Sequence, residues 1–118
     1  MGLIQEKSFL LSREIVSVYT CLTREKKEYV LSRQLLRSGT SVGANAAEAG
    51  AAQSKKDFIC KMNISYKEAQ ETLFWLRLLK ETGYLNHSNS DHVMKLCEEV
   101  CRILCAILKT ANNNLNNG

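Results

Sequence analysis

The chain has 118 residues, 45% of them hydrophobic, with 16 lysine and arginine residues, 12 aspartate and glutamate residues, and no proline. This length corresponds to one domain, and the lack of proline argues against an all-β fold, whose turns and edge strands usually contain it. No apolar run approaches the roughly 18 uninterrupted residues of a membrane span, so we expect no membrane contact.

Two amphipathic helices are predicted in the first half of the chain. The first covers about residues 5–23, where apolar residues recur at the spacing of one helix face. Its stripe consists of Leu11, Ile15, Val18 and Leu22. After a short charged stretch, a second helix covers about residues 28–50. Its stripe consists of Leu31, Leu35, Ser38, Val42, Ala46 and Ala49.

Two further helices are predicted in the second half. The third covers about residues 55–82, begins with a capping box of Ser54 and Asp57, and ends where Gly83 forms a left-handed C-terminal cap. Its stripe consists of Phe58, Met62, Ser65, Ala69, Thr72, Leu76 and Leu79. After a polar loop over residues 86–90, the fourth covers about residues 90–110. Its stripe consists of Val93, Leu96, Val100, Leu104 and Ile107.

Short connections between four helices predict an all-α fold, an antiparallel up-down-up-down four-helix bundle. We expect one domain over residues 1–111. The asparagine-rich residues 112–118 contain too little apolar surface to offset the entropy of ordering, so we expect a disordered tail there.

The positive charge is concentrated in one part of the chain. Residues 24–67 carry nine basic side chains against four acidic ones. Such an excess is typical of a surface that binds nucleic acid through its phosphates. The candidate binding residues are Lys26, Lys27, Arg33, Lys55 and Lys56. The alternative is a solvated helix surface that serves solubility.

The second predicted helix is unusual because nearly every residue from 38 to 52 is small. Gly39 and Gly43 each weaken a helix by roughly 1 kcal/mol relative to alanine, so close packing against another backbone is expected to compensate. A polar stripe lies beside the apolar one. It consists of Arg37, Ser41, Asn45 and Glu48. We expect this stripe to be buried or interfacial, which would require partners for its charges.

Candidate chemistry elsewhere is weak. Cys97, Cys101 and Cys105 share a face of the fourth helix, but zinc sites usually draw four ligands from turns and helix ends, so we expect buried thiols and no metal. Glu68 and Glu71 with Glu48 form either a carboxylate cluster or ion pairs with bases such as Arg37. No nucleophile or phosphate-loop motif occurs, and we expect no enzymatic activity and no cofactor.

Other features concern location and stacking. An odd number of cysteines and the absence of a secretory signal favour a reducing, cytoplasmic location. Phe74, Trp75 and Tyr84 are either core and interface anchors or platforms on which unpaired bases stack.

Several segments together carry a family resemblance. Residues 34–48 read QLLRSGTSVGANAAE, residues 54–59 read SKKDFI and residues 80–85 read KETGYL, with Asn63, Glu68 and Glu71 between them. In this order they resemble the four-helix-bundle proteins encoded within intervening sequences of bacterial 23S ribosomal RNA genes. The similarity extends over about residues 6–110.

The resemblance implies a small bundle that assembles into a ring, typically a homopentamer, without established enzymatic activity. Related accessory proteins of diversity-generating retroelements are similar, form a basic pentameric barrel, and bind nucleic acid and a reverse transcriptase. Our leading hypothesis is therefore a cytoplasmic homo-oligomeric ring whose basic surface binds structured RNA or DNA. The alternative is an adaptor ring that docks a partner protein, with incidental nucleic-acid contact.

Overall fold

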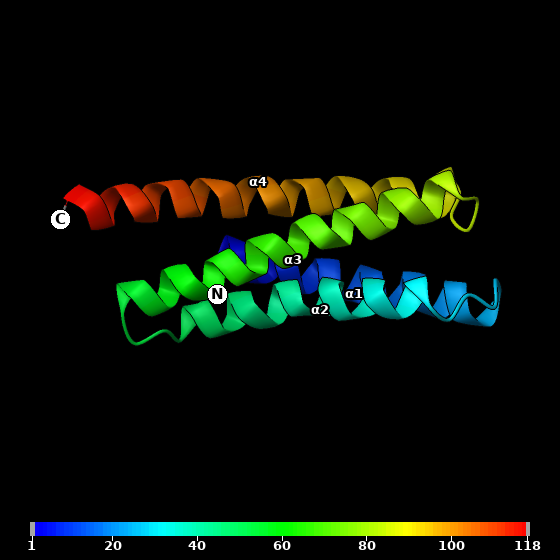
Figure 1. Ribbon diagram of the computed structural model, residues 1–118, viewed down its shortest axis with the longest axis horizontal. Helices are drawn as coiled ribbons and strands as arrows, with labels where there is room; N and C mark the ends of the chain where they lie inside the picture. Colours follow the sequence, from blue (N-terminus) through cyan, green and yellow to red (C-terminus); the bar gives the residue numbers. More distant parts are fainter. Residues whose placement is uncertain (1, 118) are drawn as a thin grey trace.

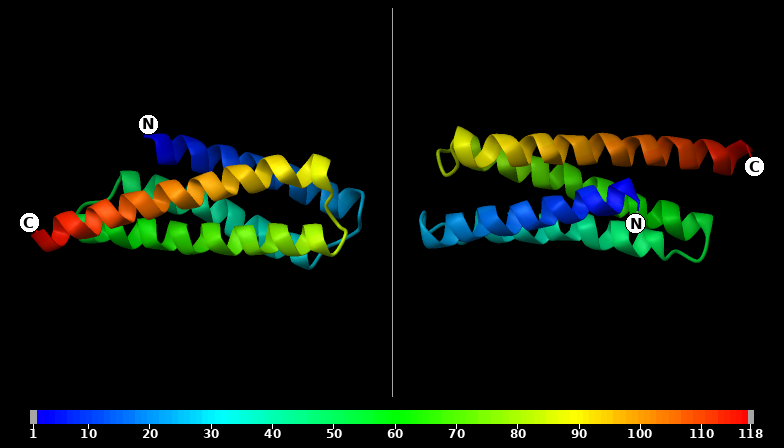
Figure 2. Two further views of the ribbon diagram at one scale, coloured as in Figure 1. Left: turned by 90° about the horizontal axis from the view of Figure 1, so that it is seen from above. Right: turned by 180° about the vertical axis from the view of Figure 1, so that it is seen from behind.

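The structure, a computed structural model, describes the backbone of residues 2–117 and the side chains of residues 2–114. It contains four helices in antiparallel alternation: α1 (Leu3–Arg24), α2 (Leu31–Gly50), α3 (Lys55–Glu81) and α4 (His87–Asn117). Each helix packs against the next one along the chain, and α1 also packs against α4 (Figures 1 and 2). The bundle measures 51 × 22 × 20 Å. The predicted all-α, up-down-up-down four-helix bundle is confirmed.

The predicted apolar stripes form the core. Nearly all of their members are buried, and Leu31, Phe58 and Ile107 are half-buried at the margins. The stripes meet because the helices are nearly parallel and each presents one face inward. Each helix therefore contributes one row of side chains to a common core.

Helix α2 approaches α1 closely at its two internal glycines. A Cβ atom on Gly39 would lie 2.7 Å from both Cγ atoms of Ile15, and one on Gly43 would lie 2.8 Å from the hydroxyl of Ser12. The same proximity lets the Ser12 hydroxyl donate to the Gly39 carbonyl oxygen at 3.2 Å. The amide of Gln5 likewise donates to the carbonyl oxygen of Ala46 at 3.1 Å. The predicted close packing of the glycines is confirmed, with α1 as the neighbour.

The ends of α3 follow the predicted caps. The Ser54 hydroxyl accepts a hydrogen bond from the Asp57 backbone N–H at 3.0 Å. At the other end Gly83 has φ 88°, and the N–H groups of Tyr84 and Leu85 donate to the carbonyl oxygen of Leu79. Leu85 is buried against the core, whereas Tyr84 stays exposed.

Helix α2 ends at Gly50 as predicted, but three other helix ends differ from the predictions. Helix α2 begins at Leu31 and not near residue 28. Helix α4 begins three residues early, at His87, because the side chains of Asn86 and Asn89 each accept the other's backbone N–H. It also continues through Asn117, where a disordered tail was expected over residues 112–118. Extending an existing helix needs no new nucleation, so even asparagines are added to it. Gly118 lies outside the described residues.

Candidate nucleic-acid interface

The turn between α1 and α2 forms one end of the bundle (Figure 1). After α1 ends at Arg24, the chain passes through Lys27, whose φ of 56° lies in the left-handed region. A side chain with a Cβ atom is disfavoured there by roughly 1–2 kcal/mol relative to the right-handed region. The backbone N–H of Glu28 then donates to the carbonyl oxygen of Leu22 at 2.9 Å, which returns the chain to α1.

Glu28 closes this turn by capping α2. Its carboxylate accepts hydrogen bonds from the backbone N–H groups of Val30, Leu31 and Ser32, at 3.2, 3.1 and 2.7 Å. Burial opposes ionisation of Glu28, but these hydrogen bonds together outweigh it, so the pKa of this carboxyl is lowered. The negative charge also lies at the positive end of the α2 dipole. Sequence analysis missed this cap because glutamate is not one of the usual N-cap residues.

Exposed cations surround the capped turn. Lys26 and Lys27 are exposed before the cap, and Arg33 is exposed on the first turn of α2. Tyr29 and Val30, which follow Glu28 directly, are 53% and 72% exposed. This end of the bundle, comprising Lys26, Lys27, Tyr29, Val30 and Arg33, is called the basic turn below.

The remaining predicted binding residues lie at the opposite end. Lys55 and Lys56 are exposed on the first turn of α3, beyond the end of α2. The 20 residues of α2 separate the two groups by about 30 Å. The predicted basic surface is therefore divided in one chain, and neither group alone contains all five residues.

All five side chains are free of ion pairs within the described residues. By contrast, Arg37 and Lys61 are held by carboxylates. The five cations therefore keep their charge available to a ligand.

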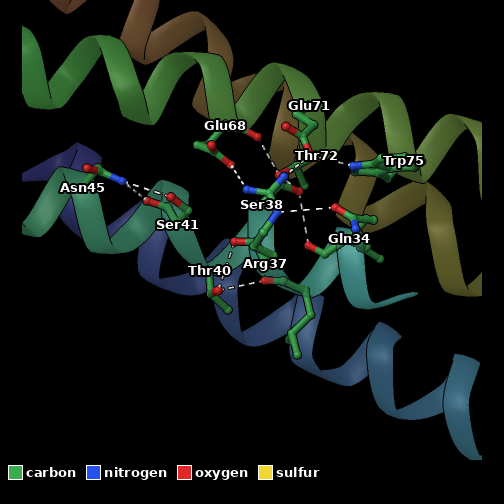
Figure 3. A network of polar contacts seen from close by, with 12 residues as sticks. Gln34, Arg37, Ser38, Thr40, Ser41, Asn45, Glu68, Glu71, Thr72 and Trp75 are labelled. Atoms are coloured by element: carbon green, nitrogen blue, oxygen red, sulfur yellow. Dashed lines mark hydrogen bonds and ion pairs between the residues drawn. The ribbon is translucent and has the colours of Figure 1, made fainter. Parts of the chain in front are cut away.

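Figure 3 shows the network centred on Arg37, which joins α2 to α3. Its guanidinium donates to Glu68 at 3.2 Å and to Glu71, and the indole N–H of Trp75 also donates to Glu71, at 2.9 Å. The Trp75 hydrogen bond and the Arg37 cation lower the pKa of Glu71 against the opposing effect of burial. Hydrogen bonding to Glu71 likewise raises the pKa of Arg37. Of the two predicted alternatives, Glu68 and Glu71 therefore form ion pairs with Arg37.

The rest of the predicted polar stripe does not join this network. Asn45 donates through its amide to the backbone oxygen and the hydroxyl of Ser41, and Glu48 pairs with Lys61 at 2.8 Å. The side chains of Arg37 and Glu48 are 50% and 57% exposed. The charged members of the stripe are therefore not buried within one chain, and a role of the stripe at an interface between chains stays a prediction. The polar side chains that are buried between α2 and α3 are smaller ones within the apolar stripes: Ser38, Ser65 and Thr72.

The three cysteines of α4 do not share one environment. Cys97 and Cys101 are buried, whereas Cys105 is exposed, because side chains four residues apart drift by about 40° around the helix axis. A hydrogen bond with Cys101 and burial raise the pKa of Cys97, which keeps this thiol protonated. Within the described part of the chain, no three His, Cys, Asp or Glu side chains gather closely enough to hold a metal ion.

A shallow apolar groove lies between the start of α3 and the second half of α4. It is lined by Phe58, Ile59, Ile107 and Ala111, with Lys55 at its edge. No helix among the described residues has the length and hydropathy needed to cross a membrane.

Comparison with known proteins agrees with this architecture. The family model for the 23S rRNA-intervening sequence protein matches residues 3–106. A crystal structure of a protein of unknown function from the S23 ribosomal protein family of Bacteroides thetaiotaomicron is similar, with a TM-score of 0.88 and 44% sequence identity. The match covers 91% of this chain and 99% of that one. None of the curated proteins compared with the chain matches it significantly. The extent of the family match, together with the confirmed bundle, shows that this chain belongs to the 23S rRNA-intervening sequence protein family.

Proposed function

We propose that this protein is a non-enzymatic, self-associating bundle that binds structured RNA or DNA through exposed lysine and arginine side chains. The observation that carries the proposal is that all five predicted binding residues are exposed and unpaired within the described chain. Unpaired cations release counterions from a phosphate backbone when they bind it, which is the main source of nucleic-acid affinity.

We propose a ring, with five subunits as in the proteins it resembles, because one chain offers few cations at either end. If the subunits pack side by side with parallel bundle axes, each end group repeats around one rim. The basic turns would then form one positive rim, and Lys55 and Lys56 would form the other. Repetition would turn a weak local charge into a continuous phosphate-binding surface.

The outer face of α2 supports self-association. This face carries the small, exposed Ala44 and Ala47. The neighbouring helices carry exposed apolar side chains, with Phe9 of α1 at 64% and Phe74 of α3 at 56% exposure. Exposed apolar side chains on the two helices that flank this stretch of small residues favour a protein contact there.

The carboxylates support a role without catalysis. Glu68 and Glu71 are held by Arg37, and Glu48 is held by Lys61. A carboxylate fixed by a cation at the protein surface serves structure better than proton transfer, since the cation favours the ionised form.

The first test measures binding of the purified protein to an RNA hairpin and to a DNA duplex at about 50 and 200 mM salt, with the mass in solution determined alongside. Several phosphate contacts per oligomer predict an affinity loss of orders of magnitude across this salt step. The double variants Lys26→Glu/Lys27→Glu and Lys55→Glu/Lys56→Glu test the two ends.

The matched control is Lys95→Glu/Arg102→Glu, which reverses two exposed cations of α4 that form no ion pair with any described residue. We expect weaker binding for at least one end variant and little change for the control. Absence of binding at the lower salt, or an equal loss in the control, would contradict the proposal.

Assembly is tested separately by Ala44→Glu, which places a charge on the outer face of α2. We expect a lower mass in solution from this variant, and an unchanged mass from Cys105→Glu, which places the same charge at an exposed position of α4. A monomeric wild type, or the same mass for both variants, would refute assembly through α2.

The groove between α3 and α4 favours a second candidate function, an adaptor that docks a partner protein. Its apolar lining of Phe58, Ile107 and Ala111 is suited to an apolar helix face. One stoichiometric protein partner that survives nuclease treatment and is lost on Ile107→Glu would favour the adaptor.

A further inference from the structure

We propose that the basic turn is the nucleic-acid site and that its ligand is an unpaired nucleotide segment, with one base stacked on Tyr29 and the adjoining phosphates held by Lys26, Lys27 and Arg33. This inference rests on the proposed function and adds to it which end binds and which form of nucleic acid is bound.

The fold presents Tyr29 and Val30 to solvent at this end. Because three backbone N–H groups hold the carboxylate of Glu28 inside the turn, the two residues that follow it lie outside the core. Val30 is the most exposed of the large apolar residues in the described chain, and Tyr29 is more than half exposed. The hydroxyl of Tyr29 makes no hydrogen bond within the described residues, so no hydrogen bond opposes reorientation of the ring. An aromatic face that is open to solvent is a platform for a base.

Cations flank this ring on both sides in the sequence. Lys26 and Lys27 precede Tyr29, and Arg33 follows it in the sequence, on the first turn of α2. The carboxylate of Glu28 occupies the N–H groups at the start of α2, so a phosphate at this end is bound by side chains and not by the helix terminus. Base stacking beside unpaired lysine and arginine is the arrangement that single-stranded nucleic acids require.

The backbone of Lys27 supports the same conclusion. A left-handed φ is best suited to glycine or asparagine, yet this position carries a long cationic side chain. A strained residue beside an exposed aromatic ring points to a functional role for its side chain. Both features lie in the basic turn.

The other exposed aromatic side chains have fewer unpaired cations beside them. Phe9 is 64% exposed and has one such cation among the described residues, Arg13, one turn later on α1. Phe74 packs edge-on against Trp75, and the arginine nearest to it in sequence, Arg77, is paired with Glu81. At the opposite end of the bundle, Phe58 lies in the apolar groove beside Lys55 and is half-buried. Among the described residues, a large exposed aromatic ring with several unpaired cations near it in the sequence therefore occurs at the basic turn.

An unpaired segment is favoured over a duplex because base pairing and stacking hide the faces of the bases. In a hairpin the loop would be the preferred part, and in a blunt duplex Tyr29 would find an open base face only at the two ends. The predicted order of affinity is single strand and hairpin loop above duplex of equal length.

The test compares fluorescein-labelled probes at about 50 mM salt: an unstructured 20-nucleotide RNA, a hairpin with a loop, and a blunt duplex. Tyr29→Leu keeps an apolar side chain but removes the aromatic face, and Tyr29→Phe keeps that face. We expect Tyr29→Leu to weaken single-strand binding by about 5- to 100-fold, with little change for duplex, and Tyr29→Phe to bind like the wild type.

The variant Lys27→Gly separates the effect of the charge on binding from any effect on stability. It removes a cation while placing the preferred residue at a left-handed φ, so the melting temperature should stay at or above that of the wild type while single-strand binding weakens. The matched control is Lys95→Ser/Arg102→Ser, which removes two exposed cations of α4 and should leave single-strand binding unchanged. A separate pair, Lys55→Ser/Lys56→Ser, removes the cations at the opposite end of the bundle and reports on that end alone.

The outcomes separate this inference from the proposed function. If binding occurs but responds to Lys55→Ser/Lys56→Ser and not to Tyr29→Leu, the site lies at the other end and the inference is wrong while the proposed function stands. Equal affinity for all three probes, unaffected by Tyr29→Leu, also overturns it. If no probe binds the wild-type protein, both fail.

Discussion

The cap that Glu28 forms on α2 gives the sharpest stability prediction. Replacing Glu28 by alanine removes the acceptor for three backbone N–H groups, one of which belongs to the buried Ser32. Loss of a cap costs about 0.5–2 kcal/mol, and loss of a charge at a helix N-terminus costs about 0.3–1 kcal/mol more. We therefore expect Glu28→Ala to lower the free energy of unfolding by about 1–3 kcal/mol at pH 7.

Glu28→Gln isolates the charge, because an amide oxygen still accepts hydrogen bonds. Since folding lowers the pKa of Glu28, the ionised carboxylate stabilises the folded state fully at pH values above its unfolded pKa. That contribution is lost as the pH falls through the lowered folded pKa. The wild type should thus exceed Glu28→Gln in stability at pH 7, and the difference should shrink toward zero in acid.

The assay is urea unfolding followed by circular dichroism at several pH values between about 7 and 3, at one protein concentration, because assembly adds to apparent stability. The control is Glu25→Gln, an exposed carboxylate in the same turn, for which we expect a change within about 0.5 kcal/mol. A difference between wild type and Glu28→Gln that does not vary with pH would refute the role assigned to the charge.

Three more predictions concern packing and the α2–α3 network. Gly39→Ala should destabilise the protein by about 1–3 kcal/mol in urea unfolding, because its Cβ would meet a side chain at 2.7 Å, whereas Gly50→Ala, with its nearest neighbour at 3.4 Å, should be neutral or stabilising. The emission of Trp75 should titrate in acid below the ordinary pKa of a glutamate, and Glu71→Gln should abolish that titration; an unchanged titration would contradict the assignment. Ser65→Ala should cost about 0.5–1.5 kcal/mol in thermal unfolding, since a buried hydrogen bond at 2.7 Å is lost; no loss would show that the bond adds nothing.

The regular spacing of apolar residues predicted most of the fold, because the burial of a residue depends on the helix face on which it lies. The stripe of α1 is buried in full, from Leu11 to Leu22, and the caps at Ser54 and Gly83 lie where they were predicted. Both caps belong to residue types with strong local preferences. Such local signals survive folding when tertiary packing agrees with them.

The parts that were missed depend on contacts that a residue pattern does not contain. The start of α2 is set by Glu28, whose capping follows from the course of the turn and not from its own preference. The polar stripe was expected to be buried or interfacial because its neighbours are small, yet small neighbours also leave Arg37 free to reach α3 at the surface. Counting charges along the sequence likewise assigned Lys27 and Lys55 to one basic surface. In the structure α2 lies between them and places them at opposite ends of the bundle.

Because the four helices alternate in direction, the two ends of the bundle carry different parts of the chain. Helix α1 begins, and α4 finishes, toward the end of the bundle that carries Lys55 and Lys56, away from the basic turn (Figures 1 and 2). Any segment fused to either terminus therefore emerges on the side opposite Tyr29. A protein tethered to a surface through a terminal tag would hold its basic turn outward, toward solution. If copies associate with their axes aligned, tags and basic turns would sort onto separate sides, and an immobilised sample would present a uniform orientation to a nucleic-acid probe.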